Sequence, residues 1–138
     1  MTELAPFPAI EDVLRRLFQR DIAGLDGAAP NRVGSAVPGN LKDVLPFVRV
    51  GRVSGPQTAL EDRPVVDVEC YATTLTLARQ LDASITTYLH AGRRQADLAG
   101  NVLVVIDAVR TETTGREIPW DDPEIRRVAS THTLTIRR

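Results

Sequence analysis

The sequence predicts an α+β fold: an antiparallel or mixed β-sheet of four to five strands with two main helices packed on one face. Three observations lead to this prediction. Two segments carry apolar residues at helical spacing. Several shorter segments alternate apolar and polar residues, as half-buried strands do. The elements also follow one another as a helix, two or three strands, a second helix and two strands, and this segregated order is typical of α+β proteins.

The bulk composition fits one domain spanning residues 1–138. The chain is 43% hydrophobic and 25% charged, which is ordinary for a globular protein. Its net charge of −1 weighs against a protein that grips nucleic-acid phosphates, because such binding needs clustered positive charge. The longest apolar run, "VLVVI", is too short to span a membrane, and the first residues lack a secretory pattern. We therefore expect a soluble intracellular domain without a membrane role.

The first predicted helix covers residues 9 to 23. Its apolar residues recur at steps of three and four, and arginines occupy most of the opposite side. The following "VGSAVPGNLKDVLPFVRV" predicts a short strand, a turn at Pro38-Gly39-Asn40 and a second strand from about Phe47. The apolar positions of this first helix are Ile10, Val13, Leu14, Leu17, Phe18 and Ile22.

The segment "RPVVDVECYA" alternates cleanly and predicts a strand, after which Thr73 or Thr74 can cap a helix running to about Ala91. We expect Val66, Val68, Cys70 and Ala72 to share one strand face, with Val65, Asp67, Glu69 and Tyr71 on the other. The expected buried stripe of the second helix is Leu77, Leu81, Ile85 and Leu89, broadened by Ala78 and Tyr88.

Two strands are predicted to close the chain. After a polar break, "NVLVVIDAVRTET" is apolar enough for a central strand. The final "VASTHTLTIRR" alternates, with Val128, His132, Leu134 and Ile136 on one face. Two long connections, "GRVSGPQTALED" and "TGREIPWDDPEIR", are expected to project from the sheet, since they exceed the usual hairpin loop lengths.

The single cysteine gives little support for catalysis. By strand alternation Cys70 lies among aliphatic neighbours, where a thiol is a small buried hydrophobe with a high pKa. The alternative is an enzyme in which the fold assembles Cys70, His132 and Asp67, but Asp67 is predicted to face away from Cys70. His90 and His132 have no metal-ligand partner at close spacing, so neither a metal site nor another cofactor is expected. A generic ligand-binding domain would need an apolar pocket that no motif announces.

The order of segments resembles the tail terminator (tail completion, or tail-to-head joining) proteins of long-tailed bacteriophages. In that family a "P-x-x-L-x-x-x-L-P-x-V-x-V" segment leads to a glycine-containing loop, and a "V-D-V-x-x-x-A" strand then enters a helix. The resemblance extends from about residue 8 to the end of the chain. Ser54-Gly55-Pro56 and Glu69-Cys70-Tyr71 depart from the usual family pattern. The matching positions are Pro38, Leu41, Leu45, Pro46, Val48, Val50, Val66, Asp67, Val68, Leu77, Ala78 and Leu81.

The resemblance implies a structural virion protein rather than an enzyme. Its subunits would form a homo-oligomeric ring, expected to be a hexamer, at the head-proximal end of the tail tube, after assembly in the host cytoplasm. The ring would end tube polymerisation and join the tail to the head connector or stopper protein. Its partners would thus be further copies of itself, the major tail tube protein and the connector, while genomic DNA passes through the lumen without specific binding. The alternative within virion assembly is a head-completion or stopper protein of the neck, or a minor tail protein.

The two long connections hold the residues expected to contact neighbouring subunits. Two interpretations of Trp120 are open: it is an interface anchor, or its side chain folds back over the core. The candidate interface residues are Arg52, Gln57, Leu60, Ile118 and Trp120.

Overall fold

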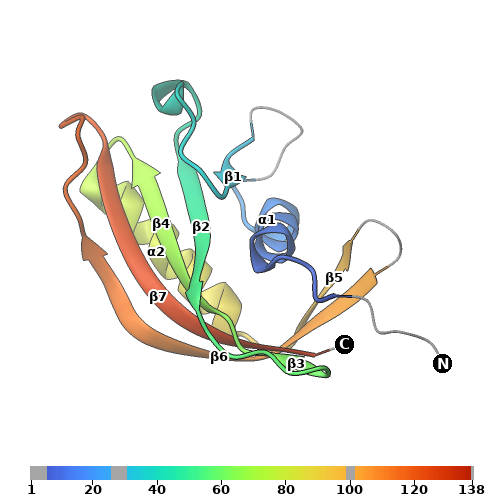
Figure 1. The fold of residues 1–138 in the computed structure, drawn as a ribbon. Coiled ribbons are helices and arrows are strands. Elements are labelled where there is room, and N and C mark those ends of the chain that lie inside the picture. The colour runs from blue at the N-terminus through green and yellow to red at the C-terminus, as the bar shows by residue number, and fades with distance from the viewer. Residues whose placement is uncertain (1–5, 26–30, 99–101, 138) are drawn as a thin grey trace.

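Two helices cover one face of a curled, mixed β-sheet (Figure 1). The computed structural model describes residues 6–25, 31–98 and 102–137. In chain order the elements are α1 (Ile10–Asp21), β1 (Val33–Gly34), the 3-10 turn η1 (Leu41–Asp43), β2 (Phe47–Ser54), β3 (Glu61–Asp62), β4 (Val65–Ala72), α2 (Leu75–His90), β5 (Arg94–Leu98), β6 (Val102–Glu117) and β7 (Arg126–Arg137).

The strand order across the sheet is β1-β2-β4-β7-β6-β5, and β3 pairs with the end of β7. Only β1 and β2 pair in parallel among these strands; every other pairing is antiparallel. The sheet curls so far that α1 contacts β1 and β2 at one end of the order and β5 at the other. In turn, α2 packs across β4, β6 and β7.

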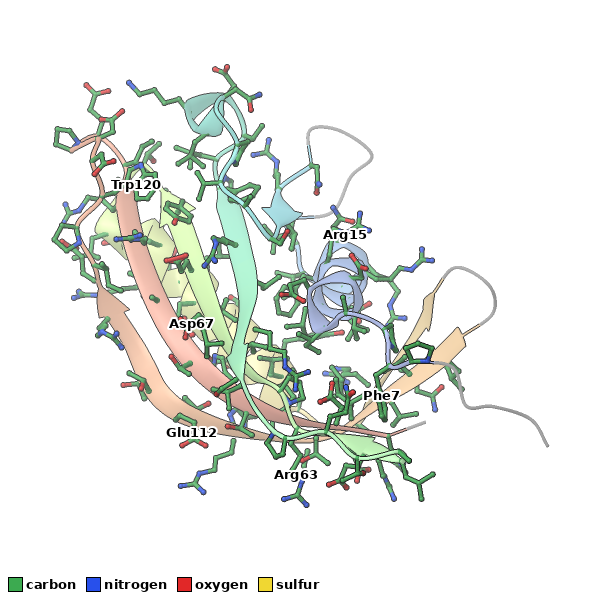
Figure 2. The ribbon with its side chains drawn as sticks, in the orientation of Figure 1. Phe7, Arg15, Arg63, Asp67, Glu112 and Trp120 are labelled. Atoms are coloured by element: carbon green, nitrogen blue, oxygen red, sulfur yellow. The ribbon has the colours of Figure 1, made fainter. Side chains whose placement is uncertain are left out.

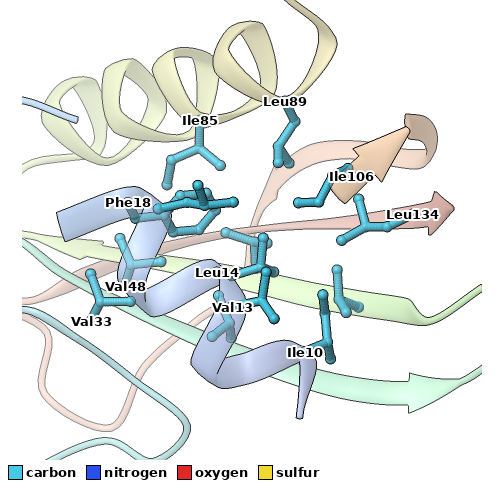
Figure 3. Packing of buried hydrophobic residues seen from close by; sticks show 14 of the residues in the cluster. Ile10, Val13, Leu14, Phe18, Val33, Val48, Ile85, Leu89, Ile106 and Leu134 are labelled. Carbon is cyan, nitrogen blue, oxygen red and sulfur yellow. The ribbon is translucent and has the colours of Figure 1, made fainter. Parts of the chain in front are cut away.

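The main core lies between the helices and the concave face of the sheet. Leu14 and Phe18 of α1 are fully buried, and so are Ile85 of α2 and Leu134 of β7 (Figure 3). A smaller cluster of Leu41, Val44, Phe47, Tyr71 and Ile125 closes one end of the sheet. Because aromatics make up only 4% of the chain, the main core consists mostly of packed aliphatic side chains.

The predicted strand count of four to five is too low, because the described residues form a sheet of seven strands. Two short strands were missed. The segment expected to be a polar break contains β5, whose sequence RQADL has no strand-like alternation. The strand β3 has only two residues, too few to show any period. In addition, β6 is not central: only the short β5 lies beyond it.

The orientation of α2 also differs from the prediction. Ala78, Ile85 and Leu89 are buried as expected, but Asp82 is buried as well, while Leu77 is 49% exposed and Leu81 half-buried. The helix is therefore turned so that a small residue and an acid face the sheet at its N-terminal end. Close approach to the strands favours Ala78 there, and Asp82 fits because Gly115 of β6 has no side chain: a Cβ on Gly115 would lie 2.1 Å from Asp82 Oδ2.

Other local predictions are confirmed. Thr74 caps α2, its side-chain oxygen accepting a hydrogen bond from the Leu77 amide at 3.1 Å. Cys70 is fully buried on the helix-covered face of β4, as its alternation predicted. On β7, Val128, His132, Leu134 and Ile136 are all buried.

Candidate assembly surfaces

Residues 55–63 follow β2 and form a tight hairpin at one end of the sheet, with β3 in its second arm. Gly55 has a φ of +117°, and a Cβ there would lie 2.0 Å from the Arg63 carbonyl oxygen, so only glycine fits. Within the turn, the Thr58 amide donates to the Glu61 carbonyl at 2.7 Å. The Arg63 amide bonds back to the Pro56 carbonyl at 2.9 Å. The hairpin is therefore an ordered projection.

Arg52 holds the base of this hairpin. It lies within β2 rather than in the loop, so the predicted long connection is reduced to residues 55–60. Its guanidinium donates to both carboxylate oxygens of Asp62, at 2.8 and 2.9 Å, and to the Gly55 carbonyl at 2.8 Å. The Asp62 side chain is only 2% exposed, so the pair is shielded from solvent. The side-chain donors of Arg52 that make these bonds are directed into its own subunit.

The hairpin and the end of β2 before it each expose an apolar side chain. Leu60 of the hairpin is 69% exposed, and Val53 of β2 is 56% exposed. Gln57 is also exposed and forms an isolated bridge to Asp62. An exposed leucine on a projecting hairpin is available to contact a partner protein.

The second connection, residues 118–125, lies at the opposite end of the sheet. Trp120 is half-buried: its ring meets Tyr71 edge-on at 5.2 Å, and the Arg127 guanidinium lies 5.0 Å from the ring centroid. Ile118 is half-buried, and its amide donates to the Arg127 carbonyl at 2.9 Å. Trp120 thus packs over the smaller core cluster with part of its ring left accessible.

The structure does not bring the five candidate interface residues together. Strand β4 separates Arg52, Gln57 and Leu60 from Ile118 and Trp120. The 55–60 hairpin comes just before the start of β4. At the other end of β4, Ala72 pairs with Arg126, next to the 118–125 loop. Figure 2 shows Arg63 and Trp120 at opposite ends of the sheet. Because β4 has eight residues, the 55–60 hairpin and the 118–125 loop lie about 25 Å apart along the strand. The molecule therefore has two separate loop-bearing ends.

An apolar groove that the sequence prediction missed lies near the Trp120 end. It has a volume of about 420 Å³ and runs between the end of α1, the Leu45-Pro46 segment and the first half of α2. Leu77, expected in the core, lines this groove instead, and Leu81 lines it while also packing against the main core. The sequence contained an indication of this groove, because α2 has more apolar residues than one buried face of a helix can hold. The groove residues are Ile22, Ala23, Leu45, Pro46, Ala72, Thr73, Leu77, Gln80, Leu81 and Ser84.

The face of the sheet away from the helices is polar and internally paired. Glu69 accepts from Arg49 at 2.7 Å and from Arg127 at 3.4 Å. Asp67 accepts from the Thr131 hydroxyl at 2.7 Å (Figure 2). Arg49 and Arg127 are thus each paired with a carboxylate within the subunit.

The candidate catalytic set is not assembled. Cys70 is inaccessible, and burial raises the pKa of its thiol well above the usual value. Asp67 lies on the opposite face of β4, bonded to Thr131. Among the described residues, no group of three His, Cys, Asp or Glu side chains could hold a metal ion. No helix in the described part of the chain is long and apolar enough to cross a membrane.

Comparison with known proteins identifies the family. No curated protein matches the chain. The family described as "Phage tail termination protein", however, matches residues 6–138, nearly the whole sequence. This family consists of structural proteins of the phage tail, in keeping with the expected virion location, and its members are in general not enzymes. The chain therefore belongs to the phage tail termination protein family.

Proposed function

We propose that copies of this chain form a ring, a hexamer, on the head-proximal end of a phage tail tube. The ring ends polymerisation of the tube protein and joins the tail to the head connector. The observation that carries this proposal is the family match over residues 6–138. The net charge of −1 is also suitable for a lumen through which DNA passes without being held.

The two ends of the subunit support assembly by head-to-tail contacts. A ring requires two different, complementary surfaces on each subunit. The exposed hairpin with Leu60 lies at one end of β4, and the apolar groove with Leu77 lies at the other. In this proposal the hairpin of one subunit enters the groove of the next. Of the predicted interface residues, Leu60 and Gln57 make that contact directly, and Arg52 supports it by fixing the hairpin.

Ile118 and Trp120 are proposed to contact the axial partners, the tube protein on one side or the connector on the other. Their loop and the 37–43 segment line a shared pocket of about 390 Å³. Partly accessible tryptophans beside such pockets are favourable interface anchors. Trp120→Ala is expected to reduce tube or connector binding while leaving ring mass unchanged.

The test of the ring contact is a matched set of three substitutions. Leu60→Asp and Leu77→Asp are each expected to shift the assembled species toward monomer, because each places a charge in an apolar contact. Leu103→Asp is the control, since Leu103 is a similarly exposed leucine, at 48%, that lies outside both surfaces. Mass from light scattering reports the outcome. An effect of Leu103→Asp equal to the other two would contradict the proposed contact.

A second experiment separates the tail terminator from a stopper protein of the neck. The tagged protein is recovered from lysed infected cells that make tails but no heads, and again from cells that make heads but no tails. A terminator is expected to co-purify with the tube protein from the first lysate. Recovery with heads alone would indicate the neck role instead.

A further inference from the structure

A chain of polar side chains runs beneath α2, between this helix and strands β6 and β7. His90 Nε2 lies 2.7 Å from Thr111 Oγ1, and that hydroxyl lies 3.0 Å from His132 Nδ1. On the other side of the ring, His132 Nε2 lies 2.9 Å from Ser130 Oγ. Asp82 of α2 lies close enough to Ser130 for the Ser130 hydroxyl to influence the pKa of its carboxyl. We call these five residues, His90, Thr111, His132, Ser130 and Asp82, the polar seam.

The seam is buried at its centre and open at one end. His132 and Ser130 are essentially inaccessible and Asp82 nearly so, whereas His90 is exposed at the end of α2. The same elements contribute aliphatic side chains to the main core: Ile85 and Leu89 from α2, and Leu134 from β7 (Figure 3). The centre of the seam is therefore shielded from solvent while α2 lies on the sheet.

Both ring nitrogens of His132 meet hydroxyl groups, so no carboxylate contacts the imidazole. Burial lowers the pKa of His132 to about 4, and the nearby His90 adds to this effect. The other titratable groups that the surrounding elements bring near the seam are Asp82 from α2 and the Cys70 thiol from β4. Burial raises the pKa of Asp82, and the nearby Ser130 hydroxyl opposes that rise. Asp82 Oδ1 has no hydrogen-bond partner among the described residues.

We propose that the polar seam is an acid-sensitive latch, which holds α2 on β6 and β7 while His132 is neutral and lets the helix open when acid protonates that ring. The latch is a property of the subunit and does not depend on the proposed ring. Since Leu77, Gln80, Leu81 and Ser84 of α2 line the apolar groove, opening the helix also removes one wall of that groove.

The direction of the pH effect follows from the two ionisations. His132 has a lower pKa in the closed state than the ordinary value of about 6.5, so closure loses stability as the pH falls from about 6.5 to about 4. Asp82 acts in the opposite direction, because its raised pKa lets the closed state bind a proton more readily as the pH falls. Replacing Asp82 therefore isolates the contribution of His132.

Cys70 is a built-in reporter of opening. It is the single cysteine of the chain and lies buried on β4, the strand on which α2 packs. The experiment measures labelling of Cys70 by 4,4′-dithiodipyridine, which reacts with thiols at acid pH. Rates between pH 7 and 4.5 are divided by those of the denatured chain. In Asp82→Asn protein, the opening equilibrium constant is expected to rise up to about tenfold per pH unit below 6.5.

Two controls keep the result interpretable. The Asp82→Asn/His90→Gln protein is expected to keep this pH dependence, because His90 lies at the exposed end of the seam. In the unmodified chain, NMR titration of the His132 ring is expected to give a pKa near 4.

A His132 pKa of 6 to 7, or labelling that is flat with pH in the Asp82→Asn protein, would overturn the latch. Labelling that rises only together with loss of far-UV circular dichroism would overturn local opening.

Discussion

Arg52 and Asp62 join the end of β2 to β3 through a bidentate pair. The carboxylate is shielded from solvent, and Arg52 also bonds to the Gly55 carbonyl. In addition, the Arg52 amide donates to Glu11 Oε2 at 3.1 Å, which ties the strand to the start of α1. At the scale of single residues, this pair fixes the hairpin that carries Leu60.

Removing Arg52 should destabilise the subunit strongly. Arg52→Ala leaves the buried Asp62 carboxylate unpaired, and we expect a loss of about 3 kcal/mol in the free energy of unfolding. The matched control is Arg63→Ala, which breaks the exposed pair with Glu61 and should cost less than about 1 kcal/mol. Urea denaturation measures both. Equal losses in the two proteins would mean that the Arg52 pair has no special structural role.

Gly115 makes the space that Asp82 occupies. A Cβ at this position would meet the carboxylate at 2.1 Å. Gly115→Ala is expected to lower stability by about 1–3 kcal/mol through overpacking. Adding Asp82→Ala should recover most of that loss, because it removes the group with which the new methyl collides. A thermal-denaturation double-mutant cycle tests this, and additive losses would contradict it.

Among elements, α2 shows best what the sequence could and could not predict. Its limits followed from Thr74 as the N-cap and Gly92 just after the helix, both local signals. The sequence did not predict which side of α2 faces the sheet, because apolar residues occur on two sides of the helix. Whether Leu77 or Ala78 packs on the sheet depends on how closely the strands approach the helix. Likewise, Asp82 became buried only because Gly115, distant in sequence, leaves room for it.

For the strands and loops too, local sequence predicted some features, and others depended on tertiary packing. Long alternating segments such as β4 and β7 were predicted with their faces, since period alone determines them. The short β3 and β5 exist because β7 and β6 offer them edges, which is a tertiary effect. Of the candidate interface residues, Leu60 and Gln57 lie exposed on the projecting hairpin, but the ion pair of Arg52 required knowledge of where Asp62 lies.

The cap of α2 gives an element-scale prediction. Thr74→Ala removes the side-chain acceptor of the Leu77 amide and should cost about 1 kcal/mol in the free energy of unfolding. The neighbouring Thr73→Ala is the control, because Thr73 is exposed and lies outside the cap position. Chemical denaturation monitored by circular dichroism measures the pair. A larger loss from Thr73→Ala would contradict the assigned helix start.

At the scale of the whole molecule, one subunit has an apolar projection at one end and an apolar groove at the other. In the proposed ring these surfaces cover each other around a closed circle, and a subunit without neighbours leaves both exposed. The ring should therefore have a mass of about six times 15.1 kDa when assembled, either free or on the tube.

The most direct measurement is the length of tails in a phage whose copy of this gene is disrupted. Electron microscopy of the lysate is expected to show tubes of abnormal, extended length and heads that lack tails. Complementation with the unaltered chain should restore normal tails, and complementation with Leu60→Asp should not. Tails of normal length joined to heads in the absence of the protein would contradict the account.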